Sequence, residues 1–280
     1  MKTYRNIVHD LSQAYSDGEA RALARVVCEE VLGLSQTDIL LDKDNNLSAD
    51  EHKKTEEIII RLLKHEPIQH ILGYTTFCGH RFIVAPSALI PRPETEQLVS
   101  AILSQSIPDS STILDIGTGT GCIAISLSLS LPSACVTAWD ISSEALSVAR
   151  HNCNFHPEAN VILEQVDILN PPATDRRWNI IVSNPPYIRQ SEISQMDSNV
   201  LEHEPHLALF VPDNDPLIFY RAIAGFAQSH LEPNGQLWFE INEALDAETT
   251  RLFEDFDFYD ITVFDDSFGK PRMLKGVKQV

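Results

Sequence analysis

A strand-like apolar segment of this chain runs directly into closely spaced glycines and then into a helix-like segment. Residues 113–116 (Ile-Leu-Asp-Ile) have the apolar, β-branched character of a short buried strand. Gly117, Gly119 and Gly121 follow at alternate positions, and Cys122 opens an apolar stretch that we expect to be helical. Glycine lets the backbone approach a ligand closely, and a helix N-terminus offers free N–H groups. The pattern predicts a ligand site at the end of a strand in an α/β fold.

The spacing of the glycines narrows the class of ligand. The dinucleotide-binding fingerprint needs its third glycine three residues after the second, whereas Gly121 comes only two residues after Gly119. No lysine follows the glycines as it does in a P-loop. The loop therefore favours a cofactor without phosphates, and S-adenosylmethionine fits because its amino-acid part would lie over the loop backbone. The expected loop contacts are Gly117, Thr118, Gly119, Thr120 and Gly121.

Two acidic residues, Asp140 and Asp167, stand directly after further strand-like runs. These runs cover residues 135–139 and 161–166. By the logic of nucleotide-binding folds, Asp140 would accept hydrogen bonds from both ribose hydroxyls of the cofactor. Asp167 would take the adenine amino group, with Ile168 against the face of the ring. Because Asp also commonly caps a helix, and a helix is expected to begin near Ser142, capping remains the alternative for such acids.

The tetrapeptide Asn184-Pro185-Pro186-Tyr187 follows the apolar run Trp178–Ser183. Two consecutive prolines fix φ and lack N–H groups, so the turn would aim the Asn184 side chain and the Pro185 carbonyl at one point. Such a pair of acceptors matches a planar NH2 group, and Tyr187 would stack on the conjugated system attached to it. The alternative is a sharp exit from a buried strand, with Asn and Tyr as turn and packing residues. Methylation of a conjugated, poorly nucleophilic nitrogen is the leading hypothesis.

Gly117, Asp140, Asp167 and Asn184 share one position relative to the predicted strands. Each stands at the carboxyl end of one of four successive strands. Ligands of open α/β sheets bind at these ends. The coincidence favours a shared site over four unrelated turns.

The first 73 residues have helical rather than strand-like patterning. Breaks are expected at Asp17-Gly18 and in the polar segment 42–46, and Ser48 with Glu51 matches a capping box. Residues 74–84 read as two short strands that turn near Gly79. The expected helices are Tyr4–Tyr15, Glu19–Leu32 and Ala49–Lys64.

The later part of the chain completes an α/β domain. With 280 residues and 43% hydrophobic content, the chain is long enough for two domains with a substantial core. Two apolar stretches near the C-terminus suggest a closing antiparallel pair. The expected elements are a helix over 216–230 and strands over Gly235–Ile241, Phe258–Phe264 and Met273–Val280.

The chain is strongly acidic, with 21 basic and 40 acidic residues and a net charge of −19. This charge disfavours a protein that grips long nucleic acid through its phosphates and favours a basic protein partner. The cysteines and histidines show no spacing typical of structural zinc or of a disulfide framework, so no metal is expected. No apolar signal segment or membrane-length apolar run is present, so we expect no membrane association and a cytoplasmic location.

Together these motifs resemble the HemK/PrmC family of protein-glutamine methyltransferases, and the resemblance spans nearly the whole chain. Leu89–Glu96 carries part of the resemblance, and within it Ile90–Glu96 (Ile-Pro-Arg-Pro-Glu-Thr-Glu) is the segment most specific to that family. The glycine loop and Asn-Pro-Pro-Tyr are shared with wider groups of methyltransferases. The remaining similar segments are Pro67–Gly73, the hairpin with Phe77 and Phe82, Glu204-Pro205, Ala208-Leu209 and Glu240-Ile241.

The resemblance implies an α/β fold of the Rossmann-like class I methyltransferase type. Its sheet is expected to be seven-stranded and mostly parallel, with a small all-α N-terminal domain joined by a β-hairpin. The implied domains are 1–73 for substrate recognition, 74–92 as a hairpin linker and 93–280 for S-adenosylmethionine-dependent methyl transfer. The implied substrate is the side-chain amide of the glutamine in the Gly-Gly-Gln motif of peptide chain release factors.

The same resemblance assigns roles to individual residues. Asn184, which would also touch the cofactor, and Pro185 would each accept a hydrogen bond from the glutamine amide, while Pro186 and Tyr187 complete the substrate side. Arg92 and Glu94 would shape the entrance, with surface ion pairing as the alternative for these two. Three features depart from the family pattern: Ile168 replaces a common aromatic residue, Asn242 replaces a common glycine, and residues 211–215 lack the glycines often seen in that loop.

Three other functions remain compatible with the sequence. The first is glutamine methylation of a large-subunit ribosomal protein, which would use the same pocket. The second is methylation of the exocyclic amino group of adenine in DNA or RNA, against which the acidic charge counts. The third is a non-catalytic cofactor-binding scaffold, which has no need of both the glycine loop and Asn184.

Overall fold

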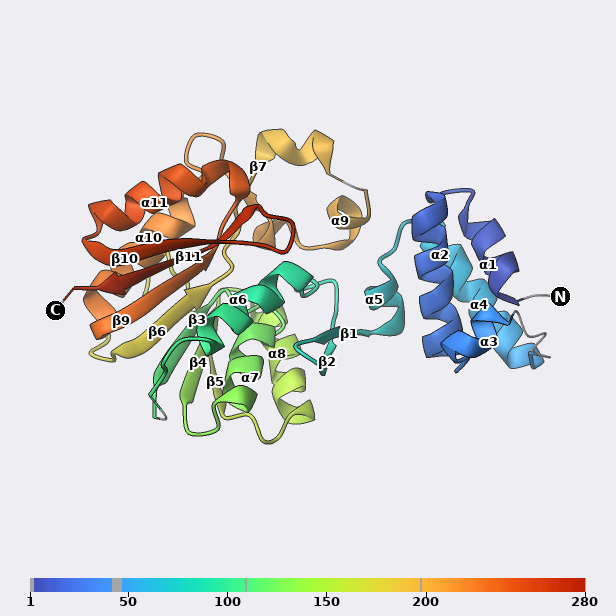
Figure 1. Cartoon of the computed structure of the whole chain (residues 1–280), viewed down its shortest axis with the longest axis horizontal. Coiled ribbons are helices and arrows are strands. Elements are labelled where there is room, and N and C mark those ends of the chain that lie inside the picture. The colour runs from blue at the N-terminus through green and yellow to red at the C-terminus, as the bar shows by residue number, and fades with distance from the viewer. Residues whose placement is uncertain (1–2, 42–46, 109, 197, 280) are drawn as a thin grey trace. The chain divides into compact units, whose positions relative to one another are not determined.

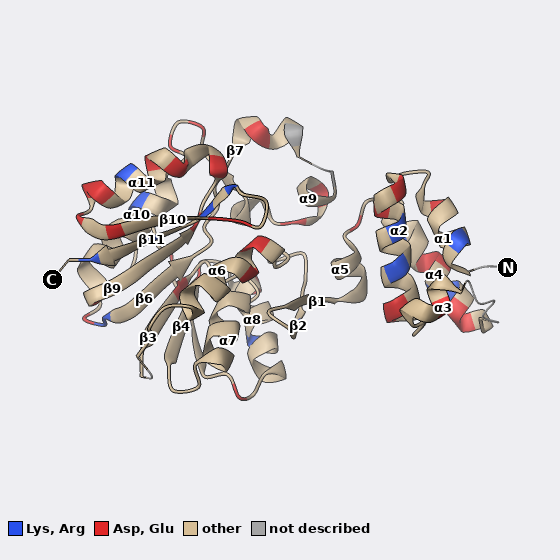
Figure 2. Cartoon of the chain, in the orientation of Figure 1, with Lys and Arg blue, Asp and Glu red and all other residues tan. Residues whose placement is uncertain are grey.

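The computed structural model describes residues 3–41, 47–108, 110–196 and 198–279, which form two compact units (Figure 1). The smaller unit comprises the described residues up to Leu72 together with Ser198–His203, and the larger unit comprises the others. Acidic residues are spread over helices of both units, with basic residues interspersed among them (Figure 2). The excess negative charge is therefore not confined to one segment.

The regular secondary structure of the smaller unit is entirely helical among its described residues. Its core is formed by side chains that are fully buried, among them Leu11, Ala24, Val27 and Leu62. The Tyr15 hydroxyl donates a 2.6 Å hydrogen bond to the Leu62 carbonyl and so joins the turn after the first helix to the end of the fourth. The elements are α1 (Thr3–Leu11), α2 (Asp17–Val26), a π-helical turn (Val27–Val31), α3 (Gln36–Leu40), α4 (Ala49–Leu62), α5 (Ile68–Leu72) and α9 (Ser198–His203).

The helix starts of this unit follow from their capping residues. Ser48 and Glu51 form the predicted capping box at α4, with reciprocal bonds of 3.2 Å and 2.8 Å. The expected break between the first two helices exists, but it lies between Leu11 and Asp17 and not at Asp17-Gly18, because Ser16 accepts a hydrogen bond from Glu19 N and α2 begins at Asp17. The expected break at 42–46 lies outside the described residues.

The larger unit is built on a seven-stranded sheet in the order β10-β11-β9-β6-β3-β4-β5. The pairs from β9 through β6, β3 and β4 to β5 are parallel, and β11 pairs antiparallel with both β9 and β10. The predicted seven-stranded, mostly parallel α/β sheet is confirmed. The strands are β3 (Thr112–Ile116), β4 (Cys135–Asp140), β5 (Val161–Gln165), β6 (Trp178–Ser183), β9 (Leu231–Glu240), β10 (Phe258–Asp265) and β11 (Pro271–Lys278).

Helices cover both faces of this sheet (Figure 1). The apolar side chains of α6 and α7 pack in one buried cluster, and those of α10 and α11 pack in another. Central strands such as β3 are thus buried on both faces, which explains their continuous apolar runs. The helices are α6 (Pro93–Leu103), α7 (Cys122–Ser130), α8 (Ser143–Phe155), α10 (Ile218–His230) and α11 (Asp246–Asp255).

Shorter elements complete the larger unit. The predicted hairpin is confirmed, since β1 (Tyr74–Phe77) pairs antiparallel with β2 (His80–Ile83) across a turn at Gly79. Helices α6 and α11 and the short pair β7 (Ile188–Arg189) and β8 (Phe210–Val211) were not expected from the sequence. The 3-10 turns are Gln190–Gln195, His206–Ala208 and Glu243–Leu245. Among the described residues, no helix combines the length and apolar character of a membrane span.

Candidate active site

A cavity lies at the carboxyl ends of four neighbouring parallel strands of the larger unit, β5, β4, β3 and β6. Residues that follow each of these strands line it, as the sequence predicted from their shared position. Leu89, Ile141, Leu169 and Leu207 add apolar surface. Ten predicted site residues line the cavity, namely Arg92, Gly117, Thr118, Gly119, Thr120, Asp140, Asp167, Ile168, Asn184 and Pro186.

Four predicted site residues do not line this cavity. Gly121 is the last glycine of the loop and faces Ala149 on α8. Pro185 is buried in the turn after β6. Glu94 is half-buried in the first turn of α6. Tyr187 packs beside the apolar cluster under α10 and α11.

The three loop glycines all have positive φ angles, of +74° at Gly117, +56° at Gly119 and +81° at Gly121. This conformation is one that other residues rarely adopt. A Cβ on Gly117 or Gly119 would meet no atom within 4 Å, whereas one on Gly121 would lie 3.3 Å from Ala149 Cβ. The first two glycines therefore leave open space beside the cavity, and the third allows close packing against α8.

Asp140 holds the glycine loop to the end of β4. Its Oδ2 accepts a hydrogen bond of 2.8 Å from Gly119 N, and its Oδ1 accepts one of 2.9 Å from Ser142 N. The cap of α8 is Ser142, whose hydroxyl accepts from Ala145 N at 3.1 Å. Asp140 is therefore not the helix cap. Burial raises the pKa of Asp140, while its bonds to backbone N–H groups favour the ionised form.

Asp167 stabilises the turn that follows β5 while lining the cavity. Its Oδ1 accepts a 2.9 Å bond from Leu169 N, and its Oδ2 accepts a 2.8 Å bond from the Asn170 side chain. The adjacent Ile168 is half-buried and also lines the cavity. The turn thus presents a carboxylate and an apolar side chain side by side.

Asn184 is half-buried and connects the cavity to a buried polar cluster. Its Nδ2 donates a 3.2 Å hydrogen bond to Thr95 Oγ1, and Thr95 Oγ1 donates a 2.6 Å bond to Glu240 Oε2. The Tyr187 hydroxyl donates a 3.2 Å bond to the other oxygen, Glu240 Oε1. Both ends of the Asn-Pro-Pro-Tyr turn are therefore tied to one buried carboxylate.

Arg92 lines the cavity with its guanidinium bound to Glu204. The Glu204 side chain is only 1% exposed, and its Oε2 also accepts a 3.1 Å bond from Ile90 N. Arg92 is thus ion-paired, but its partner is the buried Glu204, so the alternative of a surface ion pair is wrong for this residue. Glu204 fixes both Arg92 and the preceding backbone.

Sequence reasoning assigned no role to four residues that hold this site together. Three of them could have been found from the sequence, because they lie within segments that resemble the family. These three are Thr95, Glu204 and Glu240. Asn152 had no such signal. Its Nδ2 donates to the carbonyls of Thr120 at 2.9 Å and Ile83 at 3.0 Å, and so ties the glycine loop to the hairpin.

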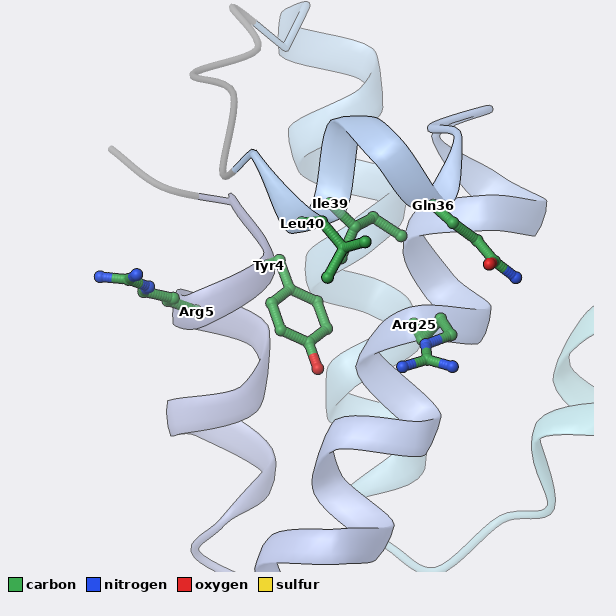
Figure 3. Close-up of a pocket in the computed structure, with 6 residues that line it drawn as sticks. All are labelled: Tyr4, Arg5, Arg25, Gln36, Ile39 and Leu40. Atoms are coloured by element: carbon green, nitrogen blue, oxygen red, sulfur yellow. The ribbon is translucent and has the colours of Figure 1, made fainter.

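A second hollow lies in the smaller unit, between residues of α1, α2 and α3 (Figure 3). It holds none of the predicted site residues and has no carboxylate or thiol among its lining side chains. The lining residues are Tyr4, Arg5, Arg25, Gln36, Ile39 and Leu40. The chemistry predicted from the sequence is therefore concentrated in the larger unit.

Comparison with other proteins identifies the family. A protein of Bacteroides thetaiotaomicron named release factor glutamine methyltransferase is 48% identical over 269 residues, which cover 96% of each chain. The chain belongs to the release factor glutamine methyltransferase family. A Flavobacterium psychrophilum protein of the same name is 42% identical over 98% of each chain. The predicted resemblance to the HemK/PrmC protein-glutamine methyltransferases is confirmed.

Two parts of the chain match the sequence models of two different domain families. Residues 3–73 match the PrmC N-terminal domain, and residues 94–205 match the methyltransferase small domain. Among solved structures, a methyltransferase from Pyrococcus furiosus superposes with a TM-score of 0.56 at 17% identity, covering 79% of this chain and 98% of that one. The T. thermophilus 16S rRNA methyltransferase RsmC, in complex with AdoMet and guanosine, superposes with a TM-score of 0.53 at 16% identity. The superposition covers 74% of this chain and 50% of that one. These similarities establish the class I methyltransferase fold.

Proposed function

We propose that this protein methylates the side-chain amide nitrogen of the glutamine in the Gly-Gly-Gln motif of peptide chain release factors, with S-adenosylmethionine as the methyl donor. The observation that carries the proposal is that Asn184 lines the same cavity as the glycine loop and Asp140. An amide-recognising side chain thereby stands beside a candidate cofactor site. Relatives that bear the name release factor glutamine methyltransferase match the chain over nearly its full length.

The cavity residues fit S-adenosylmethionine. The open space beside Gly117 and Gly119 would receive the amino-acid part, and Asp140 retains free lone pairs for the ribose hydroxyls. Asp167 would accept from the adenine amino group, with Ile168 on the ring face. When bound, the cofactor supplies a methyl group made electrophilic by its sulfonium centre.

The chain's own contribution to the reaction is orientation of the acceptor nitrogen. The lone pair of an amide nitrogen is delocalised into its carbonyl, so the nitrogen is a poor nucleophile. Asn184 Oδ1 has no hydrogen-bond partner among the described residues and is available to accept one amide proton. The Pro185 carbonyl would accept the other. Correct placement at near-attack distance is worth on the order of 7–11 kcal/mol in favourable intramolecular reactions, without a strong base.

The remaining predicted groups contribute to substrate access and recognition. Arg92, held by Glu204, would border the entrance, and Glu94, two residues further along the chain, would act outside the cavity lining. Residues 1–73 would recognise the release factor, and residues 93–280 would catalyse the methyl transfer. Residues 74–92 would form the hairpin linker between these two domains. The match of residues 3–73 to a domain profile of this family supports the first assignment. The reaction would take place in the cytoplasm without a direct nucleic-acid or membrane contact.

The proposal is tested by incubating the purified full chain with isotopically labelled S-adenosylmethionine and a purified release factor, followed by peptide mapping. One labelled methyl group on the Gly-Gly-Gln glutamine is expected. A release factor with that glutamine replaced by alanine is the control and should remain unlabelled. Parallel incubations with ribosomal proteins and with DNA and RNA test the alternatives. Labelling of one of these substrates instead of the release factor would contradict the proposal.

A further inference from the structure

Glu240 is a buried carboxylate that the proposed reaction does not use directly. It ends β9 and is 2% exposed, and Thr95 on α6 is 3% exposed. Two hydroxyls donate to it, Thr95 at 2.6 Å to one oxygen and Tyr187 at 3.2 Å to the other. A buried carboxyl group without partners is costly, and the two hydroxyl donors offset part of that cost.

The charged and titratable groups around Glu240 come from several elements. Burial raises its pKa, and Glu94 on α6 adds to that rise. The Thr95 hydroxyl, Arg272 on β11 and the Tyr187 hydroxyl act in the opposite direction and favour the carboxylate. From α10, the Tyr220 hydroxyl donates a 3.0 Å bond to the backbone carbonyl of Glu240. The Glu240 side chain therefore has two hydroxyl donors, and Tyr220 holds the backbone of the same residue.

The donor and acceptor capacities of this cluster fix the direction of each hydrogen bond. Thr95 and Tyr187 both donate to Glu240, so the single hydroxyl hydrogen of Thr95 points at Glu240. The Thr95 oxygen can then only accept from Asn184, which must offer its NH2 group and not its carbonyl oxygen. The two ends of an asparagine amide have nearly the same shape, so the network decides which end faces Thr95.

We infer that Thr95 and Glu240 are positioning residues that hold the Asn184 amide with its oxygen toward the substrate. The inference rests on the proposed function and deepens it. With the amide reversed, Asn184 would present N–H groups to the NH2 group of a glutamine, and no hydrogen bond would form. The hydrogen bonds from Glu240 through Thr95 to Asn184 thus make the site favour a substrate that offers an NH2 group as the acceptor of the methyl group.

Isosteric variants test the positioning role. Thr95→Val removes the hydroxyl, and Thr95→Ser retains it. The matched control is Thr249→Val on α11, because Thr249 is also fully buried and donates one hydrogen bond, of 2.7 Å to the Leu245 carbonyl. We expect Thr95→Val to lower kcat for release-factor methylation by about 10- to 100-fold, as for a lost bond to a charged network. Thr95→Ser should restore most of kcat, and Thr249→Val should match the wild type.

Glu240→Gln tests the carboxylate. Thr95 and Tyr187 donate to different oxygens of Glu240, and a glutamine side chain places an NH2 group, which cannot accept, at one of these two positions. We expect kcat to fall while the dissociation constant of S-adenosylmethionine stays unchanged. If Thr95→Val and Glu240→Gln both keep the kcat of Thr249→Val, while the wild type methylates the release factor, the inference is wrong and the proposed function stands.

A second measurement reads the amide orientation without any turnover. The Asn184 side-chain NH2 signals, assigned in 15N-asparagine-labelled protein, should show slow hydrogen exchange for the proton bound to Thr95. Thr95→Val should shift these signals and remove the protection, whereas Thr249→Val should leave both unchanged. Unaltered Asn184 signals in Thr95→Val would overturn the inference even if the release factor proves not to be the substrate.

Discussion

The backbone N–H of Gly119 donates a 2.8 Å hydrogen bond to Asp140 Oδ2, so the glycine loop after β3 and the end of β4 are held together. The Asp140 carboxylate therefore has two functions in the proposed site. It fixes the loop over which the cofactor would lie, and it retains lone pairs for the ribose hydroxyls.

Asp140→Ala should weaken the binding of S-adenosylmethionine. Both the acceptor for the ribose and the anchor of Gly119 are lost, so we expect the dissociation constant to rise by about 10-fold or more. Isothermal titration calorimetry measures it directly. Glu144→Ala, which removes a nearby carboxylate on α8 that does not line the cavity, is the control. An Asp140→Ala protein that binds as tightly as this control would remove Asp140 from the cofactor site.

Gly121→Ala should destabilise the larger unit more than a comparable change elsewhere. The new Cβ would have a left-handed φ of +81° and would lie 3.2 Å from Ile125 Cδ1 and 3.3 Å from Ala149 Cβ. Gly269→Ala is the matched control, because Gly269 has a φ of +77° and open space around it. Crowding should cost Gly121→Ala about 1–3 kcal/mol beyond the control. Equal free energies of unfolding for the two variants would contradict the packing role.

Asp115 should make the stability of the protein depend on pH. Burial raises the pKa of this carboxyl to about 7, while the Thr118 hydroxyl donates a 2.6 Å bond that opposes the rise. The unfolded value is about 3.9, so as the pH rises the unfolded chain ionises first. The free energy of unfolding should therefore decrease between about pH 4 and pH 7 and change little from this group above that range.

Asp115→Asn should remove this part of the pH dependence of the free energy of unfolding. Between pH 5 and pH 7 the wild type should lose about 2 kcal/mol more stability than the variant, as measured by urea unfolding. Asp255→Asn, at an exposed position on α11, serves as the control. Parallel pH profiles for the wild type and Asp115→Asn would show that Asp115 is not the responsible group.

The sequence predicted the elements whose local patterns are strong. Strands β3, β4 and β6 are continuous apolar runs because both faces of the sheet are covered, and the glycine loop marks the turn between β3 and α7. Helix α6 was missed although Pro93 at its first turn and Glu94 with Glu96 are recognisable start signals. These residues were interpreted as a family motif and not as a helix.

The polar network behind Asn184 had no local signal. Thr95 and Glu240 are 145 positions apart, and only the packing of α6 beside β9 brings their side chains to 2.6 Å. The role of Gly121 was likewise hidden, because the contact with Ala149 depends on how α8 packs. Sequence patterns identified which residues surround the cavity, whereas the residues that orient them required the tertiary structure.

The most direct test of the proposed chemistry is the rate of release-factor methylation by Asn184→Ala, measured together with its affinity for S-adenosylmethionine. Removal of the amide that orients the acceptor nitrogen should slow turnover by about 100-fold or more. The dissociation constant of S-adenosylmethionine should stay close to that of Asn154→Ala, an exposed asparagine on α8. Near-normal turnover by Asn184→Ala would contradict the account, since the Asn-Pro-Pro-Tyr turn would then not position the substrate.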